Sequence, residues 1–122
     1  MEISYLDIAN FLSVQNELNQ LKLPAKYAVR VARAVRRARE YYADIDEIRK
    51  RIISDVGIVE GENLTEEQKR ANEEKLPLAN EKFNEALKEK VSIDVEPIDV
   101  EELDKDVELS INLLDKALWL FK

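Results

Sequence analysis

A run of arginines and lysines is the part of this sequence whose residue types and spacing most clearly suggest chemistry. Seven cations and no acid lie between Leu18 and Arg39, in a chain of formal net charge −7. At about 100° per residue, four of these cations fall on one face of a helix: Lys26, Arg30, Arg33 and Arg37. Guanidinium groups pair bidentately with phosphates and carboxylates, so this face is a candidate site for nucleic acid, a nucleotide or an acidic partner protein. The alternative is a solvated helix face that the protein's own acids partly neutralise.

An acidic segment near the C-terminus carries the opposite charge. Eight acids and one lysine lie within residues 94–108: Asp94, Glu96, Asp99, Glu101, Glu102, Asp104, Asp106 and Glu108, with Lys105. A divalent-cation site is one interpretation, but the glycine that a calcium loop needs for its sharp turn is missing. Mimicry of nucleic-acid charge is a second interpretation. The favoured one is a solubilising or self-pairing surface that docks on the arginine stripe of the same chain or of a neighbour.

Catalytic and metal-binding chemistry has few residue types to draw on. The chain contains no His and no Cys, which removes the commonest general base, the commonest transition-metal ligands and any disulfide. The carboxylates of Glu40, Asp44 and Glu47 have a spacing that ordinary helix-surface patterning also produces. There is no glycine-rich phosphate loop and no serine within a glycine elbow. We therefore predict that the chain is not an enzyme and binds no metal or cofactor.

The basic stripe requires a long amphipathic helix to position it. Pro24 is a favoured first helical residue, Gly57 suits a left-handed C-cap, and no Gly or Pro lies between them. The apolar side of this helix is formed by Tyr27, Val31, Val35, Ala38, Tyr42, Ile45, Ile53 and Val56. Residues 5–20, capped by Ser4, form a shorter helix, and the short connection predicts an antiparallel hairpin of the two.

The middle of the chain predicts a third helix. Thr65 and Gln68 form a capping box, and residues 66–75 are polar almost all round, which is typical of a weakly held helix or a mobile arm. Pro77 marks a break or a fresh start. The helix after it, which extends to about residue 90, has an apolar stripe of Ala79, Phe83, Ala86 and Leu87.

A short strand follows the third helix. Val91, Ile93 and Val95 alternate with polar residues, which predicts a half-buried strand that ends at Pro97. Because a lone strand leaves its backbone unpaired, it needs a partner. The candidates are Ile98–Val100, Ile3–Tyr5 and another subunit.

The last residues predict a C-terminal helix capped by Ser110. Its predicted stripe consists of Ile111, Leu114, Leu118 and Phe121, widened by Leu113, Ala117 and Leu120. Trp119 and Phe121 either tie the tail to the core or form an aromatic anchor for a partner.

Composition favours a single domain over residues 1–122 with a mainly α fold. We predict a helical hairpin with a long second helix, a third and a C-terminal helix, and a short β segment near residues 91–100. The negative net charge argues against general affinity for nucleic acid or acidic membranes. No apolar run approaches a membrane span and the N-terminus lacks a signal-peptide pattern, so we expect a soluble, intracellular protein.

Three stretches carry a resemblance to a known group: Leu21-Lys-Leu-Pro-Ala-Lys-Tyr-Ala28, Val91-Ser-Ile-Asp-Val95 and Ala117-Leu-Trp-Leu-Phe121. In their order along the chain they resemble small uncharacterised helical proteins encoded by tailed bacteriophages and prophages. These motifs are patterns of packing rather than of chemistry. The resemblance implies a viral origin, in the cytoplasm of an infected cell or in the virion, and it implies no activity.

The sequence therefore predicts a non-enzymatic, bacteriophage-encoded protein-interaction module, either a virion-assembly accessory or an inhibitor of a host factor. Its partner would be another protein or a second copy, and no membrane is expected. The predicted contact residues are Lys26, Arg30, Arg33 and Arg37, with Trp119 and Phe121 as the possible anchor. The alternative is an anion or nucleic-acid binding protein that uses the same basic face.

Overall fold

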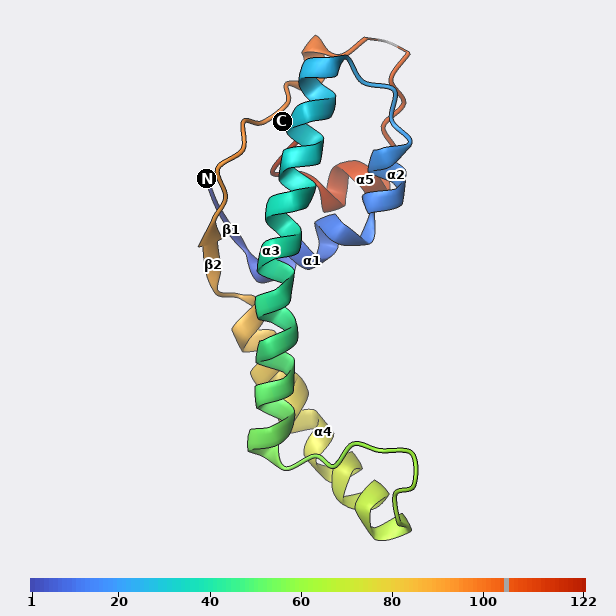
Figure 1. The fold of residues 1–122 in the computed structure, drawn as a ribbon, viewed down its shortest axis with the longest axis vertical. Coiled ribbons are helices and arrows are strands. Elements are labelled where there is room, and N and C mark those ends of the chain that lie inside the picture. Colours follow the sequence, from blue (N-terminus) through green and yellow to red (C-terminus); the bar gives the residue numbers. More distant parts are fainter. Residues whose placement is uncertain (105) are drawn as a thin grey trace.

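The computed structural model describes residues 1–104 and 106–122, and it confirms a mainly α fold with one small sheet. The elements follow one another as β1 (Glu2–Ser4), α1 (Tyr5–Ser13), α2 (Gln15–Asn19), α3 (Ala25–Val56), α4 (Glu66–Leu87), β2 (Lys90–Ser92), the 3-10 turn η1 (Val100–Glu102) and α5 (Ile111–Lys116). Figure 1 shows an elongated molecule with α3 running through most of its length. Within the described residues, no helix combines the length and the apolar character needed to cross a membrane.

The long helix α3 has the bounds that its caps predict. It runs from Ala25 to Val56, so Pro24 is the N-cap and not the first helical residue as predicted. Gly57 is the C-cap, and its φ of 85° is the left-handed conformation that glycine adopts without strain. The N–H groups of Gly57 and Ile58 both donate to the carbonyl of Ile53 and close the last turn. With 32 residues the helix is about 48 Å long, so its two halves meet different neighbours.

The hydrophobic core lies against the N-terminal half of α3, where α1, α5 and the chain ends meet. Its largest fully buried side chains are Phe11, Phe121, Ile8, Ile93, Ile98, Leu113 and Leu120. On α3 the buried residues are Tyr27, Val31, Ala34, Val35, Ala38 and Ile45. The predicted apolar side is therefore confirmed as far as Ile45, with one exception: the side chain of Tyr42 is 48% exposed. Beyond Ile45, Ile53 and Val56 are only half-buried.

The predicted strand pairs with the N-terminus, which was one of its three candidate partners. β1 and β2 form an antiparallel pair in which Ile3 lies opposite Val91. The strand is shorter than predicted because the ladder stops at Ser92, although Ile93 and Val95 remain buried. Ile98 forms a separate parallel bridge with Phe121, in which its N–H donates to the carbonyl of Leu120 at 2.7 Å.

The predicted helix over residues 5–20 is divided in two at Val14. The capping box of Ser4 with Asp7 is confirmed. At Val14, however, φ is −107° and ψ is 16°, and its N–H donates to the carbonyl of Phe11, three residues back. This tight turn ends α1, and α2 then starts in a new direction (Figure 1).

The helix α4 passes through Pro77, contrary to the prediction of a break or a fresh start there. Proline removes one helical hydrogen bond, but it can be accommodated by a helix that other contacts hold. The first half of α4 has such contacts. Its capping box at Thr65 is complete, Asn72 exchanges two hydrogen bonds with the backbone of Val59, and Lys75 donates to the carbonyl of Gly57.

The C-terminal helix is shorter than predicted, and its buried side is not centred on the residues of the predicted apolar stripe. Ser110 caps it as expected, but α5 ends at Lys116. Leu113, Ala117, Leu120 and Phe121 are buried, whereas the predicted stripe members Ile111 and Leu118 are 87% and 65% exposed. The reason is the bridge between Ile98 and Phe121, which draws the last residues out of helical geometry and turns Phe121 into the core.

Candidate interaction surface

The predicted contact residues lie on the N-terminal half of α3, on the side that faces away from the core. Lys26, Arg33 and Arg37 are exposed, and so are their neighbours Arg36 and Arg39. We call these five exposed cations the basic face. Arg30 lies at its edge and is only partly accessible, with 27% of its side chain exposed.

Arg30 is used within the fold. Its guanidinium pairs with the carboxylate of Glu96 at 3.0 Å and donates to the carbonyl of Pro97 at 3.2 Å. It also lies 5.3 Å from the centre of the Tyr27 ring, and the Tyr27 hydroxyl donates to Glu102 at 2.7 Å. These contacts hold the segment around residues 96–102 against one side of α3. Arg30 is therefore a structural clamp more than a free contact residue.

Among the described residues of the acidic segment, those that contact the arginine stripe do so at this clamp. In the part of the chain that the structure describes, no ion pair involves Lys26, Arg33, Arg36 or Arg39. Arg37 pairs with Glu40 at 3.4 Å, and both side chains are half exposed or more. Such a surface pair contributes little to stability. The expected neutralisation of the stripe by the chain's own acids is thus largely absent.

Like charges on the basic face repel one another. Residues three or four apart are neighbours on a helix surface, and like pairs at this spacing destabilise it by roughly 0.2–0.5 kcal/mol each. The pairs of this kind within the basic face are Arg33–Arg36, Arg33–Arg37 and Arg36–Arg39, and two more, Lys26–Arg30 and Arg30–Arg33, involve Arg30 at its edge. The first turn of α3 also contains no acid, although the helix dipole favours negative charge there. The sequence thus concentrates positive charge where the helix stabilises it least.

A groove with a mixed polar and apolar lining runs beside the basic face, between α3 and the pair α1 and α2. It consists of two adjoining hollows of about 440 Å³ each, which share the side chains of Gln15 and Arg39. One hollow is lined by Leu18, Leu21, Leu23, Ala28, Ala32 and Val35, among others. The other is lined by Ala9, Leu12, Ser13 and Tyr42, besides the two shared residues. We call this feature the α2–α3 groove.

Sequence reasoning missed this groove and the residues that define it. The sequence pattern places Tyr42 on the apolar side of α3, yet its side chain is 48% exposed and lines the groove. Ala28 and Ala32 lie one turn apart and leave space that larger side chains would fill. That small-residue spacing was the available signal. It could not be interpreted without the direction of α2, which depends on the turn at Val14.

The rest of the acidic segment is exposed where the structure describes it. Asp99 caps η1 by accepting from the N–H of Glu101. Asp106 and Glu108 line a shallow hollow with Glu17 and Lys22. Among the described residues, no three His, Cys, Asp or Glu side chains are placed to hold a metal ion. Lys105 lies outside the described residues.

The two C-terminal aromatic residues lie against the core. Phe121 is 1% exposed, and the Trp119 ring packs on Phe11 with centroids 4.6 Å apart. Phe121 therefore ties the tail to the core, whereas Trp119 packs on the core and remains partly exposed. The indole Nε1 of Trp119 is buried and has no hydrogen-bond partner among the described residues.

The neighbouring carboxylates Glu40, Asp44 and Glu47 are all exposed. Asp44 accepts a hydrogen bond from the Tyr5 hydroxyl at 3.1 Å, and both residues border an open hollow with Glu47. Partial burial, followed by the hydrogen bond and negative charge of Asp44, raises the pKa of Tyr5 above its ordinary value of 10.0. An open hollow does not provide the burial by which enzymes raise the pKa of a catalytic carboxyl group.

No protein-family model, no curated protein and no solved structure matches this chain.

Proposed function

We propose that this chain is a non-enzymatic protein-interaction module that binds an acidic segment of a partner protein along the basic face and the α2–α3 groove. The observation that carries the proposal is the unneutralised charge of the basic face. Five like-charged neighbour pairs and a helix start without acids cost stability in the free protein. A partner that supplies carboxylates would remove this cost. Sites at which a sequence sacrifices stability are often functional sites.

The groove supports the same kind of partner. The leucine, valine and alanine side chains of its lining would receive aliphatic side chains, and Arg39 lies where its two hollows join. Val29, which is 54% exposed, and Ala32 lie among the cations on the same helix. A segment with carboxylates on one side and aliphatic residues on the other would satisfy both features.

Nucleic acid fits this surface less well. The segment that Arg30 clamps places the carboxylates of Glu96 and Glu102 at the edge of the basic face. A long phosphate backbone would approach these carboxylates and would also meet a molecule of net charge −7. The resemblance to phage-encoded proteins would make the partner a virion component or a host factor, but the proposal does not depend on that origin.

Binding of a designed peptide tests the proposal. The probe is an amphipathic helix with Glu on one face and Leu on the other, followed by fluorescence anisotropy. We expect binding that weakens as salt is added, and at least a tenfold loss for Arg33→Glu with Arg36→Glu, which is about 1.4 kcal/mol. The matched control, Lys69→Glu with Arg70→Glu on α4, makes the same change in net charge and should bind as the parent does.

Three results would reject this function. The first is the absence of peptide binding to the parent chain. The second is an equal loss in the Lys69 and Arg70 control, because general charge would then explain the effect. The third is tighter binding of a duplex DNA oligonucleotide than of the peptide under the same conditions, which would favour the nucleic-acid alternative.

A further inference from the structure

The part of the molecule formed by residues 46–87 has little core of its own. This distal hairpin consists of the C-terminal part of α3, the connecting loop and α4 (Figure 1). Between residues 46 and 86 only one side chain is buried, that of Ala79, at 7% exposure. Leu76, Leu78 and Val59 remain 50%, 49% and 45% exposed. Two helices alone cannot enclose an apolar face, and a third or fourth helix is normally needed.

A groove opens along one side of this hairpin. Its volume is about 360 Å³, and it is lined by Ile52, Ile53, Ile58, Leu76, Ala79, Asn80 and Phe83, with Arg49 and Glu60. On α4 the residues Leu76, Ala79, Phe83 and Ala86 follow one another at intervals of three, four and three. That is the spacing of side chains at the seam of coiled coils and four-helix bundles. We call this feature the distal groove.

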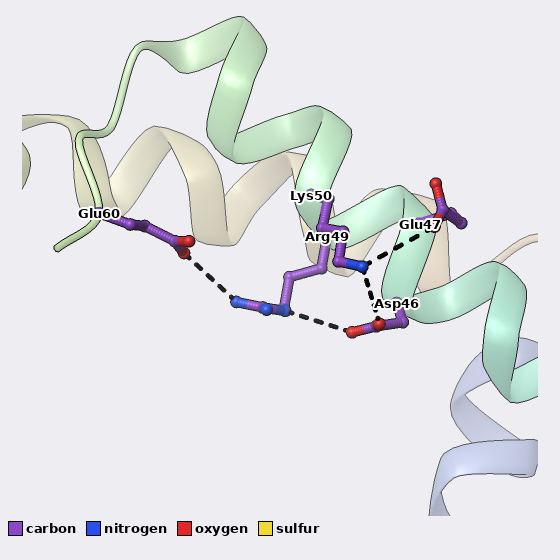
Figure 2. A network of polar contacts seen from close by, with 5 residues as sticks. All are labelled: Asp46, Glu47, Arg49, Lys50 and Glu60. Atoms are coloured by element: carbon purple, nitrogen blue, oxygen red, sulfur yellow. Dashed lines mark ion pairs between the residues drawn. The ribbon is translucent and has the colours of Figure 1, made fainter.

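Charge distinguishes the possible occupants of the two grooves. Around a two-fold axis each patch meets its own copy, so a dimer interface must be complementary to itself. The basic face carries a single sign and would repel a second copy. The distal groove carries both signs, because Arg49 on α3 and Glu60 in the loop line it together, paired at 3.7 Å. Figure 2 shows Arg49 reaching from α3 toward Glu60, with Asp46 on its other side. In a symmetric pair these side chains can exchange partners across the interface.

We propose that the distal hairpin is a dimerisation element, in which two copies pack their distal grooves together as a four-helix bundle. Leu76 of each copy enters the groove of the other beside Ile53 and Phe83. The α3 part of the hairpin, residues 46–56, spans about 17 Å, so the part of the face that is two helices wide offers roughly 330 Å² in projection. Stable interfaces of standard size bury about 800 Å² per partner, so we expect this dimer to lie at the weak end of known interfaces.

The matched pair Leu76 and Leu78 tests this arrangement. Both side chains are about half exposed, but they lie about 200° apart around α4, and only Leu76 lines the groove. Light scattering of the parent chain should give twice the chain mass of 14.2 kDa. Leu76→Asp should give a monomer with unchanged helical circular dichroism, whereas Leu78→Asp should remain a dimer. A monomeric parent chain, a dimeric Leu76→Asp or a monomeric Leu78→Asp would each overturn the proposal.

Cross-linking provides a test that does not depend on introducing a charge. The chain contains no cysteine, so a single introduced thiol can only be joined to another copy. Asn80→Cys, which lines the distal groove, should be joined into a covalent dimer by a short bismaleimide, and Leu78→Cys should not. Equal yields from the two variants would overturn the proposal. Arg33→Glu with Arg36→Glu should leave the dimer mass unchanged, so failure of the proposed function and failure of this inference remain distinguishable.

Discussion

Replacing an arginine of the basic face should stabilise the free protein, although surface substitutions usually have little effect. Arg33 has like-charged neighbours at Arg30, Arg36 and Arg37, and it makes no ion pair in the described structure. At roughly 0.2–0.5 kcal/mol per pair, Arg33→Gln removes about 0.6–1.5 kcal/mol of repulsion. Gln and Arg have nearly the same helix propensity, so the backbone contributes little to the difference. Salt screens exposed charges, and the gain should therefore be largest at low ionic strength.

Urea unfolding followed by circular dichroism measures this gain. With a slope of about 1–3 kcal/mol per molar urea, a gain of 1 kcal/mol raises the midpoint by roughly 0.3–1 M. The matched control is Arg51→Gln on the same helix, since Arg51 has the acids Glu47 and Asp55 four residues away on either side. That variant should lose about 0.4–1 kcal/mol. If Arg33→Gln lowers the midpoint, or if its gain persists in about 1 M salt, repulsion on the basic face is not the cause.

Three further predictions concern the fold. Phe11→Ala should destabilise the protein by about 3–5 kcal/mol, because the side chain is fully buried. Urea unfolding followed by the fluorescence of the single tryptophan measures this loss, and a loss under about 1 kcal/mol would refute the core assignment. Gly57→Ala should cost about 1–2 kcal/mol, because φ at this residue is 85°, and an unchanged urea midpoint would contradict this. The pKa of Tyr5 is raised by burial and by Asp44, so its contribution to stability is complete below pH 10.0 and is lost as the pH rises through the higher folded value. Absorbance titration against Tyr5→Phe should show one tyrosine ionising late, and its absence would remove this assignment.

Local signals predicted much of the fold. The bounds of α3 follow from Pro24 and Gly57, and the capping residues Ser4, Thr65 and Ser110 mark the starts of three other helices. Each of these signals acts within a few residues of the chain. Alternation around residue 91 identified a strand, but its partner remained one of three, because pairing with β1 joins residues almost ninety positions apart.

The remaining differences between the predicted and the observed structure depend on tertiary contacts, which a single sequence does not reveal. Residues 111–121 include apolar side chains at eight positions, so several helical stripes are equally compatible with the pattern. The bridge from Ile98 to Phe121 decides between them. The basic face was predictable from spacing alone, whereas its freedom from the acidic segment and the presence of the α2–α3 groove follow from tertiary packing.

The placement of both chain ends in the core has a consequence for the order of folding. Ile3 pairs with Val91, and Phe121 closes the core beside Ile98, so these contacts join distant parts of the chain. The contacts within residues 46–87 are local along the chain, and local contacts form fast. During synthesis we therefore expect the hairpin to form well before Phe121 leaves the ribosome. Under the proposed dimerisation, copies made on one messenger RNA would then meet through their hairpins while the basic face still lacks the core beneath it.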